Sequence, residues 1–378
     1  MFSINKEEIM EQSVMDTQKY DQKNNISYKR EQYLINMLLF IVFSTLLSCE
    51  SEPNKHKRLL SSDSISFHLR SKKFTKVVVG YSNLGSPLTA HFFPGKNKEI
   101  ALIVAGMHGS ELSAIELADS LIAAFKKLPE INRNVIIIPC LFPDNAAVAD
   151  KYRARGDANS LTGRYTSSKH ADPNRQMPSL GKAFDTTASD HVGRIIEPEN
   201  QILLELIGFI RPTLIISLHS ISNLEFAGVF ADPRTDSNGE AIGFYEDSFL
   251  AIKVANNILR DGGNVNGNRL KSTPNAIYYT DPSAVAKGKF QARNFGDSVA
   301  NNKRGYGVSF GSWCSTAISD PENSKDNREA IQILTIEFPG YNRSIDFNDS
   351  ISKKSVQNEL RAYTSAIVGI FLQDGDDN

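Results

Sequence analysis

The sequence is poor in cysteine, in net charge and in long apolar runs, and each shortage excludes a class of protein. Three cysteines in 378 residues cannot form the disulfide framework of a small secreted domain. A formal net charge of -1, without a basic stripe interleaved with aromatic residues, excludes nucleic acid as an expected partner. The apolar run at residues 37–48 is shorter than the roughly 20 residues of a membrane-spanning helix. What remains is a globular chain, 40% hydrophobic and 22% charged, long enough for one large domain.

The apolar run at residues 37–48 has the features of a secretory signal core. Lys29 and Arg30 precede it, and Cys49 follows it directly. The four residues from Leu46 to Cys49 resemble the lipobox of bacterial lipoproteins, in which the cysteine is lipidated and becomes the mature N-terminus. The resemblance implies a protein of the bacterial cell envelope that is bound to a membrane through a lipid on Cys49.

This interpretation divides the N-terminal part of the chain into two pieces. Residues 1–48 would be the signal region, and residues 49–64 the lipidated cysteine with a polar tether. The polar region before the apolar run is long for a signal peptide, so translation from Met15 or Met37 is one alternative. A buried N-terminal helix is the other.

Apolar periodicity divides the rest of the chain into alternating strands and helices. We expect strands at residues 76–79, 89–93, 100–104, 134–139, 213–218, 226–230 and 331–338, and helices at residues 112–125, 199–210, 247–259 and 355–371. This order favours an α/β fold, a single domain with a mixed, mostly parallel sheet and helices on both faces. The catalytic domain would span residues 65–373, followed by an acidic tail at residues 374–378.

Two long polar segments interrupt this pattern. Residues 143–198 have little apolar periodicity, and a loop of that length inside a compact domain is usually functional. We therefore expect the segment to form one wall of an active site. Residues 262–311 are rich in Gly and Asn and are expected to form loops over the same site.

The residues with the clearest chemistry are His108, Glu111 and His219. His108 and Glu111 lie where the strand at residues 100–104 gives way to a helix, and His219 ends the strand at residues 213–218. Ligands of open α/β sheets bind at this edge. Two imidazoles and one carboxylate can hold Zn2+ and leave a fourth position for water, which is the arrangement of a catalytic metal site.

Two further groups extend the candidate site. Asn174 and Arg175 combine an amide donor with a guanidinium fork that binds carboxylates in bidentate fashion. Glu337 ends an apolar strand, where a carboxylate is an unusual choice unless it is needed. Burial beside an activated water would let Glu337 take the proton of that water.

As an ordered set, these residues resemble the zinc carboxypeptidases of the M14 type. The similarity is greatest to the murein tripeptide amidase-like branch, which overlaps the succinylglutamate desuccinylase and aspartoacylase group. It covers residues 76–340 and includes the segments at 106–111, 216–220 and 334–339. The fold expected from the resemblance is that of a zinc carboxypeptidase.

The resemblance implies a role for each matching residue. His108, Glu111 and His219 would hold one Zn2+ per chain, Glu337 would be the general base, and Asn174 with Arg175 would bind the free carboxylate of the substrate. The family also places an arginine upstream of that pair to stabilise the oxyanion. An insertion at about residues 157–171 blurs the alignment there, and both Arg153 and Arg155 fit, with Arg153 preferred. No tyrosine maps with certainty to the one that closes over the substrate in digestive enzymes; Tyr278, Tyr279 and Tyr306 are candidates.

Three functions remain open at this point. The leading one is a zinc amidase or carboxypeptidase acting on small peptides with a free carboxylate, such as cell-wall peptides cut between D-glutamate and diaminopimelate. The second is a zinc deacylase of N-acyl amino acids, which shares the metal ligands but needs only a small pocket. The third is a lipoprotein that binds peptides without catalysis, and the presence of Glu337 argues against it because a binding module needs no general base.

Overall fold

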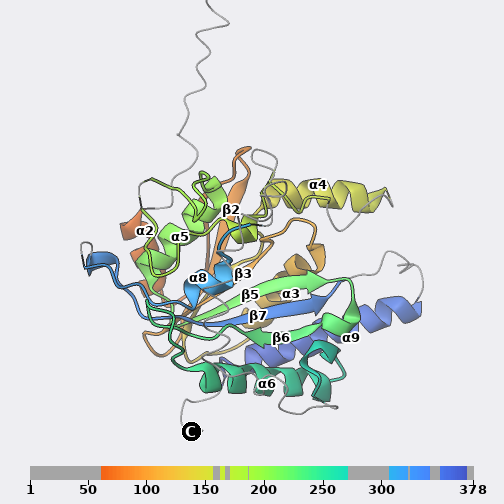
Figure 1. Ribbon diagram of the computed structural model, residues 1–378. Helices are drawn as coiled ribbons and strands as arrows, with labels where there is room; N and C mark the ends of the chain where they lie inside the picture. Colours follow the sequence, from red (N-terminus) through yellow and green to blue (C-terminus); the bar gives the residue numbers. More distant parts are fainter. Residues whose placement is uncertain are drawn as a thin grey trace, which may run out of the picture. The chain divides into compact units, whose positions relative to one another are not determined.

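A seven-stranded mixed sheet organises the part of the chain that the structure describes (Figure 1). The structure is a computed structural model that describes residues 61–155, 162–166, 171–185, 187–270, 306–321, 324–340 and 350–372. Its strands are β1 (Thr75–Tyr81), β2 (Pro87–Phe93), β3 (Ile100–Ala105), β4 (Asn134–Ile138), β5 (Leu214–Ile221), β6 (Gly228–Ala231) and β7 (Gln332–Pro339), in the order β1-β2-β4-β3-β5-β7-β6. The expected α/β class with a mixed sheet is confirmed.

The centre of the sheet is parallel and its edges are antiparallel. Strands β4, β3, β5 and β7 pair in parallel, whereas β1, β2 and β6 join antiparallel. The carboxyl ends of β3, β5 and β7 therefore meet at one edge of the sheet. Runs of Val, Ile and Leu in these strands suit their position, because a parallel sheet is covered on both faces.

Helices cover both faces, as expected. They are α2 (Ser62–Arg70), α3 (Leu112–Phe125), α4 (Pro143–Ala154), α5 (Pro198–Ile210), α6 (Phe244–Arg260), α8 (Phe310–Cys314) and α9 (Ser350–Gly369), with short 3-10 turns η1 (Pro173–Arg175), η2 (Leu224–Phe226), η3 (Asn266–Asn268) and η7 (Ser324–Asp326). Side chains of α3, α6 and α9 form one hydrophobic core with the sheet, and those of α2, α5 and α8 form the other. Alternate residues of each strand enter the two cores, as the period of a strand requires.

Helix α4 was not expected, because residues 143–198 were interpreted as polar loop. Pro143 occupies its first turn, where a proline costs no hydrogen bond, and alanines supply helix propensity. Only Asn145, Ala146 and Ala149 are buried along the helix. A helix with so small a buried face shows no apolar stripe in its sequence, which explains why periodicity missed it.

The N-terminal predictions fall mostly outside the described residues. Cys49, its signal region and the acidic tail at residues 374–378 all lie outside them. The described part begins with α2, whose Ile65 is fully buried. None of the helices in the described ranges has the length and apolarity needed to cross a membrane.

Candidate active site

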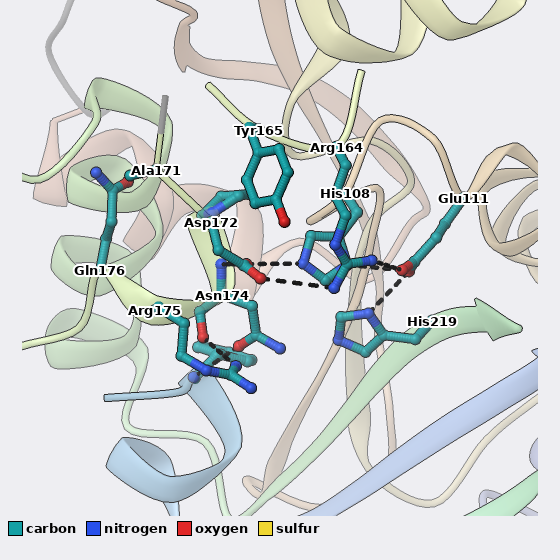
Figure 2. Close-up of polar contacts among 12 residues, drawn as sticks. His108, Glu111, Arg164, Tyr165, Ala171, Asp172, Asn174, Arg175, Gln176 and His219 are labelled. Atoms are coloured by element: carbon teal, nitrogen blue, oxygen red, sulfur yellow. Dashed lines mark hydrogen bonds and ion pairs between the residues drawn. The ribbon is translucent and has the colours of Figure 1, made fainter. Parts of the chain in front are cut away.

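His108, Glu111 and His219 meet at the carboxyl edge of the central strands (Figure 2). His108 and Glu111 come from the turn between β3 and α3, and His219 comes from β5. Nδ1 of His108 lies 2.6 Å from Oε1 of Glu111, and Nδ1 of His219 lies 2.8 Å from Oε2 of the same carboxylate. All three side chains are buried. The structure thus brings together the three residues that the sequence predicted as metal ligands.

Asp172 orients the first of these histidines. Its Oδ1 atom lies 2.9 Å from Nε2 of His108 and also accepts a hydrogen bond from the backbone N–H of Asn174. A carboxylate at Nε2 favours the tautomer with its proton there, which leaves the lone pair on Nδ1. Asp172 is not among the site residues predicted from the sequence, although it directly precedes the Pro173–Arg175 turn that carries Asn174 and Arg175.

The electrostatics of the cluster are those of a buried ion-paired network. Burial, the largest influence, lowers the pKa of His108, but the charges and hydrogen bonds of Glu111 and Asp172 outweigh it and raise that pKa to about 9. Burial likewise favours the neutral form of Glu111, yet the two histidines hold the pKa of its carboxyl well below its usual range. The donor atoms of the three ligands lie within 4.8 Å of one another. Two imidazole nitrogens and one carboxylate at this spacing fit Zn2+, which prefers nitrogen and oxygen ligands of this kind.

Glu337 stands beside this cluster on the neighbouring strand. In the parallel pair of β5 and β7, Glu337 is the register partner of His219. Burial is the main cause that raises the pKa of Glu337, opposed by His219 and reinforced by Glu111. A partly buried carboxylate with a raised pKa next to a metal site suits a group that accepts and returns a proton.

Arg164 is a site residue that the sequence analysis missed. Its Nη1 atom donates to Oε1 of Glu111 at 3.2 Å, and Nη2 lies 3.5 Å from Oδ2 of Asp172 (Figure 2). Arg153, the preferred candidate, instead pairs with Glu116 and Asp150 at 2.9 Å each.

The other candidate, Arg155, is exposed at the end of α4. The structure therefore brings Arg164 to the cluster and places Arg153 among the acids of α3 and α4. The available signal was an arginine upstream of the Asn174–Arg175 pair, and Arg164 is nearer to that pair along the chain than Arg153 or Arg155.

Asn174 and Arg175 lie next to the metal-ligand cluster on η1. Oδ1 of Asn174 accepts a hydrogen bond from the backbone N–H of Phe310 at 2.8 Å, which fixes the amide against α8. Nη1 of Arg175 donates to the carbonyl oxygen of Asn174 at 2.7 Å. Figure 2 shows both side chains on the side of His108 away from Glu111. The two tyrosine candidates Tyr278 and Tyr279 lie outside the described residues.

Arg194 holds the backbone of this pair through hydrogen bonds. Its Nη2 atom donates to the carbonyl oxygens of Arg175 at 2.7 Å and of Tyr306 at 2.6 Å, and its Nε donates to Oδ2 of Asp190 at 2.6 Å. Tyr306, the third tyrosine candidate, therefore contributes its backbone to the framework of the site. Arg194 carried no sequence signal, because its role is set by contacts between distant segments.

The chain is similar to curated proteins over part of its length. It is 29% identical over 164 residues to murein peptide amidase A of Escherichia coli K12 and to that of Escherichia coli O157:H7. Over these residues the chain is similar to murein peptide amidase A. The matched segment spans 43% of this chain and 63% of the relative. No protein-family profile matches the chain. The resemblance inferred from the sequence is thereby confirmed.

Solved structures superpose partially on this chain. The murein-tripeptide amidase of Escherichia coli O157 has a TM-score of 0.37 at 19% identity, covering 79% of this chain and 94% of its own. Carboxypeptidase A of Helicoverpa armigera has a TM-score of 0.44 at 13% identity, and the match covers 88% of this chain and 81% of the carboxypeptidase chain. A succinylglutamate desuccinylase/aspartoacylase family protein of Shewanella amazonensis has a TM-score of 0.39 at 14% identity, and the match covers 79% of this chain and 71% of the Shewanella chain.

Proposed function

We propose that this protein is a zinc-dependent hydrolase that cleaves amide bonds in small peptides with a free carboxylate. The observation that carries the proposal is the convergence of His108, Glu111 and His219 beside Glu337, on strands that end at one edge of the sheet. The similarity to murein peptide amidase A supports an amide substrate derived from the cell wall. The bond between D-glutamate and diaminopimelate is the one that we propose.

The chain's own residues divide the reaction between them. Zn2+, when held by His108, Glu111 and His219, would polarise the scissile carbonyl and acidify a water. Glu337 accepts the proton of the attacking water and delivers it to the departing amine. Arg164 donates hydrogen bonds to the oxygen on which negative charge develops, the role for which Arg153 and Arg155 were the candidates from sequence.

The residues of η1 orient the substrate. Arg175 and the amide of Asn174 bind the terminal carboxylate of the peptide, since a guanidinium fork matches the two oxygens of that group. The partly buried hydrogen bonds of Asn174 with Phe310 and of Arg194 with the Arg175 carbonyl hold this pair in place. Selection of an exposed chain end follows from this arrangement.

The deciding experiment follows cleavage by the full chain. Bound metal is quantified, and amine release is then measured by mass spectrometry from muropeptides, ordinary peptides and N-acyl amino acids, each with and without a chelator. Chelator-sensitive cleavage of a muropeptide with a free carboxyl end is the expected result. Cleavage of N-acyl amino acids alone would replace the proposal with a deacylase, and bound zinc without any cleavage would leave a peptide-binding protein.

A lipid anchor on Cys49 is a separate part of the proposal. It is supported by the sequence from Leu46 to Cys49, which would place the enzyme in the cell envelope facing away from the cytoplasm. Metabolic labelling with a clickable fatty acid tests it. Label that is absent from the Cys49→Ala variant is expected, and equal labelling of both proteins would refute the anchor.

A further inference from the structure

Arg164 lies outside any regular element, and helix α4 contacts the backbone on both sides of it. Arg164 lies in the short segment of residues 162–166, between α4 and η1. Immediately before it, Gly163 has φ of +75°, and a Cβ there would lie 2.3 Å from the carbonyl oxygen of Asn145. Immediately after it, the carbonyl oxygen of Tyr165 accepts a hydrogen bond from Nδ2 of Asn145 at 3.2 Å. Asn145 thus contacts the backbone on both sides of Arg164.

The same residue also touches the turn that carries two metal ligands. A Cβ at Gly109 would lie 2.3 Å from the carbonyl carbon of Asn145, so Gly109 brings the two backbones into direct contact. Gly109 stands between His108 and Glu111 in the sequence. Asn145 therefore lies between the backbone of Arg164 and the backbone of the metal-ligand turn.

Asn145 is itself firmly placed. It sits in the first turn of α4, behind Pro143, and its side chain is buried at 8% exposure. The preceding residue, Asp144, accepts a hydrogen bond from the backbone N–H of Leu84 at 3.0 Å, which fixes this turn against the β1–β2 connection. A buried amide on a fixed helical turn is a rigid support for an irregular segment.

We propose that Asn145 is the positioning residue for Arg164, setting the place of its guanidinium relative to His108 and Glu111. The inference rests on the proposed function, in which Arg164 stabilises the developing oxyanion. Without the Asn145 amide, the Tyr165 carbonyl loses the hydrogen bond from Nδ2 of Asn145, and the backbone next to Arg164 loses this contact with α4. Because Arg164 acts on charge that develops in the transition state, its displacement lowers kcat and leaves KM nearly unchanged.

Two variants of Asn145 and two of Asn134 test the proposal. Asn145→Leu keeps the branching of the side chain and removes the amide donor, and Asn145→Asp removes the donor and adds a negative charge. Asn134 is the matched control, since its Nδ2 also donates to backbone carbonyls, those of Asn97 and Glu99, but at the opposite end of the sheet. We expect both Asn145 variants to lose about 10- to 100-fold in kcat with KM within about twofold, and both Asn134 variants to keep kcat.

A double-mutant cycle separates positioning from loss of structure. In the Arg164→Ala background, Asn145→Leu should cause no further loss of kcat, because the residue through which Asn145 acts is already absent. An equal loss in both backgrounds would overturn the proposal.

A crystal structure of Asn145→Leu provides a readout that needs no activity. The expected result is loss of the contact between Arg164 and Glu111. A retained contact at its present distance would contradict the inference even if no substrate had been found. A wild-type protein that cleaves nothing would instead count against the proposed function.

Discussion

The Nε2 atom of His108 lies 2.9 Å from Oδ1 of Asp172, within a shell of buried groups. This contact holds the His108 ring so that its Nδ1 atom faces Glu111. Asp172 also caps η1 through the backbone N–H of Asn174. One carboxylate therefore links the metal-ligand cluster to the turn that would bind the substrate.

Replacement of Asp172 should lower the zinc affinity of the site while the protein stays folded. Asp172→Asn keeps an oxygen for the two hydrogen bonds and removes the charge that orients His108. We expect zinc affinity to fall about 10- to 100-fold, measured by competition with a chromophoric chelator. Asp247→Asn, which changes another buried carboxylate, paired with Arg234, is the control and should keep wild-type affinity. Equal affinities in all three proteins would show that Asp172 does not support the site.

Glu337→Gln should separate metal binding from catalysis. The amide cannot accept the proton of the attacking water, so turnover should fall by at least about 100-fold while bound zinc stays at the wild-type level. Metal content and peptide cleavage are measured on the same preparation. If the variant retained most of its activity, another group would have to be the base.

Arg194→Lys should raise KM more than it lowers kcat. A single ammonium cannot replace the three contacts of the guanidinium to Asp190, Arg175 and Tyr306. The expected change is a KM about tenfold higher for peptides with a free carboxyl end. Arg133→Lys is the control, because Arg133 forms a surface ion pair with Glu99, and such pairs contribute little. A larger change in kcat than in KM would place Arg194 in a different role.

The stability of the protein should depend on pH through Glu199. Its Oε1 accepts a hydrogen bond from the backbone N–H of Asn83, and burial, with help from Glu197 and Asp144, raises the pKa of Glu199 from 4.5 to about 7. Between these values the folded state keeps a proton that the unfolded chain has released. The free energy of unfolding therefore falls as pH rises from about 4.5 to 7, by roughly 3 kcal/mol at most.

Glu199→Gln tests this step, because the amide stays neutral and can still accept from Asn83. The variant should match the wild type in denaturant unfolding at pH 4.5 and exceed its stability at pH 7.5. Exposed Glu246→Gln serves as the control and should follow the wild type at both pH values. A constant difference between Glu199→Gln and the wild type would mean that Glu199 does not cause the change.

The sequence predicted the sheet and the proximity of His108, Glu111 and His219 because both depend on local patterns. His219 and Glu337 each lie near the carboxyl end of a strand rich in Ile and Leu, and the carboxyl ends of parallel strands meet at one edge. His108 and Glu111 are three residues apart in one turn, so their proximity needs no information from the rest of the chain.

The positions of Arg164 and Arg194 could not be predicted from local sequence patterns. Arg164 lies in an irregular segment whose placement depends on Asn145 in α4, a helix that itself lacks an apolar stripe. Arg194 acts through carbonyl oxygens of segments more than 100 residues apart in the chain. Every residue type has a backbone carbonyl acceptor, and the sequence therefore does not predict which carbonyl an arginine binds.

The pairing of His219 with Glu337 across β5 and β7 has a consequence for how such a protein can change. The two side chains are register partners in one hydrogen-bonded ladder, and a shift of one residue in either strand would turn its side chain to the opposite face. An insertion or deletion within β5 or β7 would therefore separate the proposed metal ligand from the proposed base. A change in the connections between strands would leave this pair in register.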